Sequence, residues 1–331
     1  MKIDCFTHVT PRRYLDEFAR RVPAGYHFSD ISGKIPELVE MSLRLEMMEQ
    51  TGVDQQVITL AAPGPEEIID DPKAAHQLAV IANDTMADLC VDYPDKFIPV
   101  GNYAMNNVTD GVAEAERCIK ELGMKGMLMY TNVRGSAIDA EAFFPFYEVM
   151  EDLDLPIWLH PARGPDVADY ADESMSKHVI WQIFGWPYET TAAMTRLIFA
   201  GVFDRFPKLK IITHHAGAML PGFDKRIEYV YPLFKHLGMT SKELDMLQKP
   251  VLDYYRMFYN DTALMGSVGG MTAALAFFGS DHLLFGTDTP LDTFGGRAFT
   301  EETITSIEAL PLPPKAKAEI YSGNLKRLLH L

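Results

Sequence analysis

Side chains that could bind a metal stand at the ends of several short apolar runs of the sequence. His8 closes the run IDCFTH, His160 closes LPIWLH, and Asp288 closes HLLFGTD. The pair His214-His215 closes LKIITHH in the same way. Imidazole and carboxylate together suit a divalent transition metal, zinc above all, and an open coordination position would take water or substrate. These residues predict a metal-assisted site if the fold brings the ends of the runs together.

The first run, MKIDCFTH, raises a question about such a site. Alternate residues of a strand share a face, so Asp4, Phe6 and His8 point the same way. A metal site at this place would use two ligands two residues apart, and one of the two positions holds Phe6. The run is therefore either part of a metal site that lacks one ligand or no part of a metal site.

Eight runs of β type, separated by helical stretches, carry these residues. They are 3–8, 55–61, 96–101, 125–130, 155–160, 209–215, 256–261 and 282–288. Strands that alternate with helices pair in parallel, and eight repeats without a break in composition predict an α/β fold, a closed (β/α)₈ TIM barrel, as one domain over residues 1–331. A doubly wound open sheet is the rival, but the chain has no Gly-rich phosphate loop after its first strand. In a barrel the strand ends meet at one mouth, which would gather the polar residues.

Local signals predict helix ends and the position of the substrate face. Asp71 is an expected N-cap with Pro72 at the first helical position, and Gly123 is an expected residue after a helix end. The segments 9–40 and 161–188 are longer than ordinary βα loops and follow strands 1 and 5. We expect these insertions to lie at the substrate face of the barrel.

Composition excludes several classes of partner and location. The chain of 331 residues has a formal net charge of −16, which argues against nucleic acid or an anionic membrane as a partner. Its three cysteines are not closely spaced and fit a reducing compartment. The sequence shows no signal peptide and no apolar run of the roughly 18 residues that a membrane helix needs. We expect a cytoplasmic protein.

Several stretches resemble one branch of the amidohydrolase superfamily, that of aminocarboxymuconate-semialdehyde decarboxylase and the non-oxidative decarboxylases of hydroxybenzoates. They are MKIDCFTH, RLEMMEQTGVDQQVIT, HPARG, PYETTAAMTRLIFAGVFDRFPKLKIITHHAGAMLP and FGTDTP, and they span nearly the whole chain. The ordered set ETT…GVFDRFPKLK…HAG is the most specific of them. The resemblance implies a metal-dependent barrel enzyme.

The resemblance also implies a set of metal ligands. His8, His160 and Asp288 match metal ligands of the family, whereas Phe6 falls on the first ligand of the strand-1 motif. Three protein ligands and a water are enough for a catalytic zinc, with manganese as the alternative single divalent metal. Loss of the fourth ligand should weaken metal affinity and leave coordination more open.

Further roles follow from the same resemblance and from residue types. His215 matches the catalytic histidine of the family, and with Asp288 it is expected to handle the proton, while His214 is expected to point to the other side of the strand. Candidates for substrate binding are Arg163, Trp186 and Tyr188. Arg163 could pair with a substrate carboxylate, or instead with a loop carboxylate such as Asp166.

Two reactions and one alternative without catalysis remain open. The branch resemblance favours decarboxylation of a small aromatic or muconate-type carboxylic acid, whereas membership of the superfamily alone favours hydrolysis of a lactone, amide or related bond. Both would use the same residues. Phe6 also permits a degenerate metal-free binding barrel. The resemblance further implies a homodimer.

Overall fold

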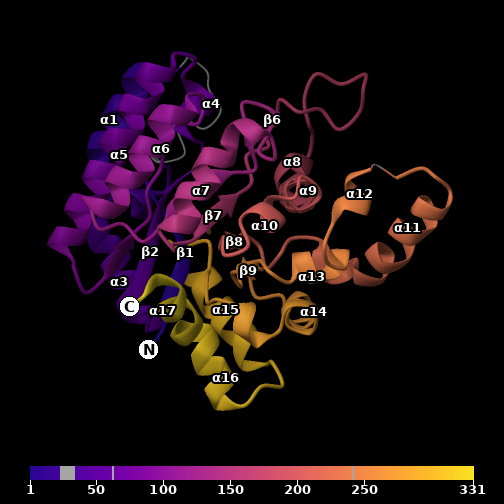
Figure 1. The fold of residues 1–331 in the computed structure, drawn as a ribbon. Coiled ribbons are helices and arrows are strands. Elements are labelled where there is room, and N and C mark those ends of the chain that lie inside the picture. The colour runs from indigo at the N-terminus through magenta and orange to yellow at the C-terminus, as the bar shows by residue number, and fades with distance from the viewer. Residues whose placement is uncertain (23–33, 62, 241) are drawn as a thin grey trace.

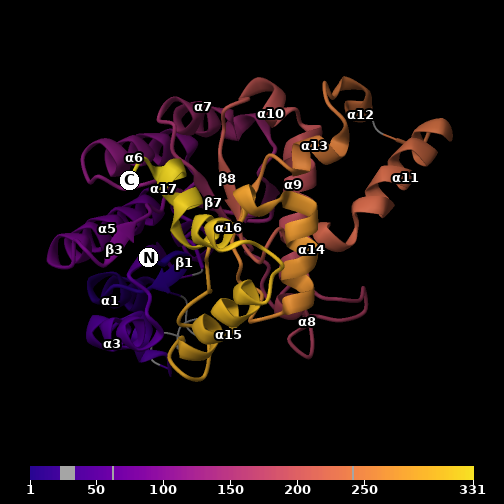
Figure 2. The same ribbon diagram turned by 90° about the horizontal axis from the view of Figure 1, so that it is seen from below.

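The structure is a computed structural model that describes residues 1–22, 34–61, 63–240 and 242–331. Figure 1 and Figure 2 show the strands at the centre of the molecule with helices arranged around them. The two chain ends lie on the same side of the molecule in both views. Among the helices of these ranges, none is both long and apolar enough to cross a bilayer.

The central strands pair in parallel. They are β1 (Ile3–Val9), β2 (Gln55–Leu60), β3 (Phe97–Pro99), β4 (Met127–Tyr130), β7 (Ile157–His160), β8 (Ile211–Thr213) and β9 (Tyr259–Asn260). One sheet has the order β1-β2-β3 and the other has the order β4-β7-β8-β9. A small antiparallel hairpin, β5 (Asn132–Val133) with β6 (Ser136–Ala137), lies outside them. The fold is therefore α/β with parallel sheets, as the alternation of runs predicts.

Single parallel bridges connect the edges of the two sheets. Gly101 pairs with Met127, Asn260 with Leu283, and Thr7 with Thr289. The first bridge joins the end of β3 to β4, and the other two place the segment after Leu283 between β9 and β1. Each sheet edge thus has a neighbour.

The segment expected as the eighth strand, 282–288, has no regular strand. It still pairs with β1, because the backbone N–H of Cys5 donates to the carbonyl of Phe285 at 2.7 Å. Gly286 allows this close approach: a Cβ there would lie 2.8 Å from the Cβ of Asp261 and 2.9 Å from the sulfur of Cys5. The run occupies a strand position without strand regularity.

Helices of different length follow the strands. They are α1 (Arg12–Arg21), α3 (Met41–Thr51), α4 (Pro65–Ile68), α5 (Pro72–Asp92), α6 (Val108–Lys120), α7 (Phe144–Asp152), α8 (Ile180–Ile183), α9 (Gly185–Phe199), α10 (Val202–Arg205), α11 (Asp224–His236), α12 (Glu243–Met246), α13 (Val251–Tyr255), α14 (Val268–Phe278), α15 (Arg297–Glu308), α16 (Pro314–Ala318) and α17 (Asn324–Leu329). Short 3₁₀ turns are Pro36–Leu38, Glu141–Phe143, Leu220–Gly222 and Ser280–His282, and a π turn is Glu319–Gly323.

The helix α5 illustrates why these segments are helical and what they bury. Asp71 caps its start by accepting a hydrogen bond from the N–H of Ala74 at 3.2 Å, and Pro72 occupies the first position. Its buried face consists of Ala75, Leu78, Ala79, Ala82, Asn83 and Met86. That spacing places one apolar stripe against the sheet. The predicted N-cap is confirmed.

The segments 9–40 and 161–188, expected to be insertions, follow β1 and β7, and only part of the first lies within the described residues. Within 9–40 the structure has α1 and a 3₁₀ turn, while 23–33 lie outside the described residues. Within 161–188 it has a long irregular loop, α8 and the first turn of α9. The second insertion follows β7 directly and therefore lies next to His160.

Candidate metal centre

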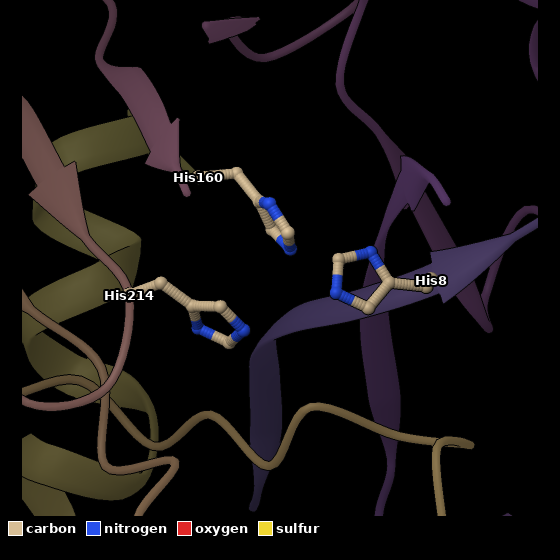
Figure 3. Close-up of side chains that lie close together, drawn as sticks. All are labelled: His8, His160 and His214. Atoms are coloured by element: carbon tan, nitrogen blue, oxygen red, sulfur yellow. The ribbon is translucent and has the colours of Figure 1, made fainter. Parts of the chain in front are cut away.

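Three imidazoles from three elements point toward one another (Figure 3). His8 lies on β1, His160 ends β7, and His214 directly follows β8. One ring nitrogen of each lies within 4.8 Å of the corresponding atoms of the other two. All three side chains are almost completely buried, with exposed fractions of 2% or less. The parallel strands thus deliver three nitrogen donors to one point inside the fold.

Asp288 adds a carboxylate to these imidazoles. Its Oδ1 lies 3.1 Å from Nε2 of His8 and 3.2 Å from Nε2 of His214. Its Oδ2 lies 3.9 Å from Nε2 of His215. His214, His215 and Asp288 form a second group whose potential ligand atoms lie within 4.8 Å of one another. His214 is the residue that the two groups share.

Apart from these close contacts with one another, the atoms that face this point lack a hydrogen-bond partner among the described residues. Nε2 of His8, Nε2 of His214 and Oδ1 of Asp288 are buried, and no described residue completes a hydrogen bond to them. Unsatisfied buried polar atoms are costly, so a cluster of them facing one another indicates a bound species that satisfies them. Imidazole nitrogens with a carboxylate oxygen are donors that zinc and manganese accept. The residues fit a divalent metal.

The other nitrogen of each imidazole is held by the protein. Nδ1 of His8 lies 3.0 Å from Oγ1 of Thr59, and Nδ1 of His160 lies 2.6 Å from the carbonyl oxygen of Pro161. Nδ1 of His214 makes a hydrogen bond with Oδ2 of Asp261. Such contacts fix the ring orientation and the tautomer of metal-binding histidines. All three rings are therefore arranged to present Nε2 to the centre.

The position of His214 differs from the expectation that it points away. Successive side chains point to opposite faces only within a strand, and β8 ends at Thr213, before His214. Beyond it the backbone turns, since His215 and Ala216 have φ of 60° and 53°. Asp261 holds the turn because its Oδ1 accepts hydrogen bonds from Ala216 N at 2.9 Å and Ala263 N at 3.1 Å. Both adjacent histidines consequently reach the site.

Phe6 lies inside the site as a buried aromatic wall. Its ring stacks on that of His214, with centroids 4.1 Å apart and an angle of 19° between the planes. The centroids of His8 and His160 lie 5.7 Å and 6.0 Å from the Phe6 ring. The position that could have carried a strand-1 ligand therefore packs against His214 instead.

Asp4 serves the loop that carries Asp288. Its carboxyl accepts hydrogen bonds from the hydroxyl of Thr287 at 2.6 Å and from the N–H of Thr287 at 3.0 Å. Burial raises the pKa of Asp4 to about 7, against the effect of these hydrogen bonds. Asp4 thereby positions the backbone next to Asp288 from the opposite strand.

Arg44, on α3, supports the site although the sequence gives no sign of this. The structure places it fully buried, donating hydrogen bonds to the carbonyl of His8 and, at 3.4 Å, to the carbonyl of Thr289. It also contacts Oε1 of Gln56 at 3.2 Å. Its signal in the sequence was weak, since nothing in RLEMMEQTG distinguishes a buried arginine from an exposed one.

Charge and burial set the protonation of the site. Burial lowers the pKa of His8, His160 and His215. For Asp288, burial alone would raise the pKa, but His214 and the other imidazoles hold it well below its usual range. For His214, burial would lower the pKa, but the two neighbouring carboxylates raise it to about 10. Neutral imidazoles and an ionised carboxylate are the forms that bind a metal, so a metal at His214 has to displace the proton from Nε2.

A pocket of about 620 Å³ opens beside the centre. Its lining includes Tyr130, Asn132, Arg134, Ala162, Arg163 and Trp186. The rings of Tyr130 and Trp186 lie 5.8 Å and 5.5 Å from that of His160, so the pocket borders the histidine cluster. Tyr188 is 61% exposed and is not among the residues that line it.

Arg163 reaches the pocket but is also tied to its own loop. Its Nη2 donates to the carbonyls of Val167 at 3.2 Å and Ala168 at 3.4 Å and lies 3.8 Å from the carboxylate of Asp169. Its backbone N–H donates to Oε2 of Glu189 at 2.7 Å. The loop carboxylate near Arg163 is thus Asp169, whereas Asp166 was the expected one.

Comparison with known proteins gives consistent matches. The family described as Amidohydrolase matches residues 3–331. The γ-resorcylate decarboxylase of Polaromonas sp. is 29% identical over 295 residues, covering 87% of this chain and 86% of that protein. The 2-amino-3-carboxymuconate-6-semialdehyde decarboxylase of Dictyostelium discoideum is 27% identical, covering 100% and 92%. A crystal structure of a dihydroxybenzoic acid decarboxylase from Polaromonas sp., with bound manganese and the inhibitor 2-nitroresorcinol, has a TM-score of 0.82 at 26% identity and covers 100% and 97%.

Proposed function

Since this chain belongs to the amidohydrolase family, we propose that it is a metal-dependent, non-oxidative decarboxylase of a small aromatic carboxylic acid. The observation that carries the proposal is the set of buried, unsatisfied donor atoms of His8, His214 and Asp288 beside a pocket. The relatives named above are decarboxylases of aromatic or muconate-type acids, and this agrees with the reaction expected from the sequence.

His8, His160 and Asp288 hold one divalent metal, zinc or manganese. The neighbouring decarboxylase structure contains manganese, and the donor set suits either ion. When bound, the ion supplies positive charge that anchors the carboxylate and an adjacent hydroxyl of the acid and stabilises charge in the transition state. The protein contributes fixed, neutral imidazoles and a dry site in which this charge acts strongly.

His215 and Asp288 handle the proton. The reaction needs a proton on the ring carbon that bears the carboxylate, after which the C–C bond breaks, its electron pair restores the ring, and carbon dioxide leaves. Nε2 of His215 lies 3.9 Å from Oδ2 of Asp288, so a proton could pass between them after a small movement. A positioned acid of this kind contributes roughly 10²–10⁴-fold to the rate.

The pocket beside His160 binds the aromatic acid. Trp186 packs its ring against His160 and donates its indole N–H to the carbonyl of Arg163 at 2.9 Å, so it forms a rigid aromatic wall. Arg163 supplies positive charge at the same wall. Tyr188, exposed on α9, belongs to the same binding region only at its rim.

The central strands close into a (β/α)₈ barrel, and residues 1–331 form one domain with insertions after strands 1 and 5. The bridges from Gly101 to Met127 and from Thr7 to Thr289 support closure, because they join the edges of the two parallel sheets. The arrangement of helices around the strands agrees with this topology.

Release of carbon dioxide tests the function. The protein is reconstituted with manganese or zinc and incubated with γ-resorcylate and a panel of hydroxybenzoates, and bicarbonate is followed by carbon-13 NMR. We expect release that a chelator abolishes and that Asp288→Asn lacks, whereas His282→Ala, a histidine outside the centre, retains it. Turnover of lactones or amides without carbon dioxide would contradict the proposal and favour hydrolysis.

A further inference from the structure

We propose that His214 is a fourth protein ligand of the metal, positioned by Asp261, and that it supplies the donor that Phe6 cannot supply. This inference rests on the metal site of the proposed function and extends its ligand set beyond His8, His160 and Asp288. It explains why the chain carries phenylalanine at a position that faces the centre.

The first step concerns the free nitrogen of His214. Nε2 is buried, has no hydrogen bond to any residue in the described ranges, and lies 3.2 Å from Oδ1 of Asp288. His214 is also the member common to both groups of converging donors. Nε2 of His214 also lies closer to the carboxylate of Asp288 than Nε2 of His215 does, at 3.2 Å against 3.9 Å.

The second step concerns what holds the ring of His214. Oδ2 of Asp261 makes a hydrogen bond with Nδ1, and Oδ1 of the same carboxylate accepts from the N–H groups of Ala216 and Ala263. Both oxygens are thus engaged, so the carboxylate has one orientation and the ring has one orientation. A carboxylate on the rear nitrogen of an imidazole is a recurrent support of metal-binding histidines.

The third step concerns Phe6. Its ring stacks at 4.1 Å on His214 and therefore fills the space on that side of the imidazole. A ligand from strand 1 and the ring of His214 could not both occupy this space. His214, which follows β8, thus takes the place of a ligand on β1. The centre keeps four protein donors, one from each of His8, His160, His214 and Asp288.

The competing role is a buried ion pair between His214 and Asp261 that has no contact with metal. In that case the pair would stabilise the turn after β8, and its removal would affect folding and leave metal binding intact. Metal binding and folding therefore have to be measured separately.

The first experiment measures metal affinity by chelator competition, with unfolding curves for each variant. We expect His214→Ala to weaken binding more than Asp261→Asn, and Asp261→Asn to weaken it about 10–100-fold. Phe6→His in the His214→Ala background should recover much of the affinity, since it returns a donor to the same space. His282→Ala is the control. A folded His214→Ala protein with unchanged affinity would overturn the proposal.

The second experiment needs no substitution and so does not depend on folding of a variant. In the cobalt-loaded protein, each ligating imidazole gives one far-shifted exchangeable N–H proton in the NMR spectrum. We expect three such signals in the wild-type protein, from the Nδ1–H groups of His8, His160 and His214. Two signals in the wild-type protein, or no binding of cobalt, would overturn the proposal. Three signals without carbon dioxide release would refute only the proposed reaction.

Discussion

Each imidazole of the centre is fixed through the nitrogen that faces away from it. Thr59, Pro161 and Asp261 provide these contacts to His8, His160 and His214. His215 differs, because its Nδ1 is buried without a hydrogen bond to any part of the chain that the structure describes. A ring without this restraint can reorient, which suits a group that transfers a proton better than a group that holds an ion.

Removal of His215 should therefore separate catalysis from metal binding. We expect His215→Asn to lower kcat for decarboxylation roughly 10²–10⁴-fold, because the proton donor is lost, while metal content stays at the wild-type level. Elemental analysis and steady-state kinetics on the same preparation check this. Loss of the metal together with activity would identify His215 as a ligand.

Glu66 should make stability depend on pH. Burial raises its pKa from 4.5 to about 8, with Glu67 contributing, and Oε2 has no hydrogen bond among the described residues. A carboxyl whose folded pKa is raised stabilises the fold at low pH, and this contribution is lost as pH rises through the folded value. As the pH rises from about 4.5 to about 8, we expect the unfolding free energy of wild type to decrease relative to that of Glu66→Gln.

Urea unfolding across that range measures the difference between the two proteins. Glu49→Gln, at an exposed position, serves as the control. Its unfolding free energy should change with pH in the same way as that of wild type. A constant difference between wild type and Glu66→Gln at all pH values would show that the buried carboxyl does not titrate in this window.

Among elements, α3 and the segment after β9 are linked to β1 through one side chain. Arg44 of α3 donates to the carbonyls of His8 and Thr289, so a helix on the outside fixes two chain segments that carry proposed metal ligands. The geometry of the centre thus depends on a helix that contributes no ligand.

Loss of this link should weaken both the fold and the site. We expect Arg44→Met to lower the unfolding free energy by roughly 1–3 kcal/mol, because buried carbonyls lose their donor, and to weaken metal affinity. Arg12→Met is the matched control, since Arg12 is largely exposed and its ion pair with Glu40 should contribute little. Equal effects of the two substitutions, in urea unfolding and chelator competition, would contradict the role of Arg44.

The strands were the most predictable elements, and the turns after them the least. β1, β2 and β7 begin and end within about two residues of the expected runs because their apolar patterns are strong. The last run occupies a strand position beside β1 without strand regularity, and its apolar pattern alone did not predict this. His8, His160 and Asp288 could be found as polar residues at run ends. His214 also stands at a run end, but its direction could not be predicted, because it depends on a backbone turn and on Asp261.

At the scale of the whole molecule, α11 and α12 project from the body in both views (Figure 1, Figure 2). Exposed apolar side chains gather there: Tyr229, Leu233, Phe234, Leu237, Met239 and Met246. Patches of this kind mark association surfaces. They are compatible with the homodimer that the family resemblance implies, which stays a prediction.

Light scattering after size exclusion tests the oligomeric state. We expect the wild-type protein to have twice the chain mass of 37.2 kDa. We expect the mass of Leu233→Glu to shift toward that of a single chain. Val91→Glu, which changes an even more exposed apolar residue on α5, should leave the mass unchanged. A wild-type monomer at all concentrations would contradict the expectation.

The central claim is that the buried histidine and aspartate centre holds a metal that decarboxylation requires. The most direct measurement titrates metal-free protein with manganese and follows bound metal and carbon dioxide release from γ-resorcylate or another hydroxybenzoate in the same sample. We predict that release rises in proportion to bound metal up to one equivalent and that Asp288→Asn shows neither. Release that is independent of bound metal, or full metal occupancy with no release from any acid of the panel, would contradict the claim.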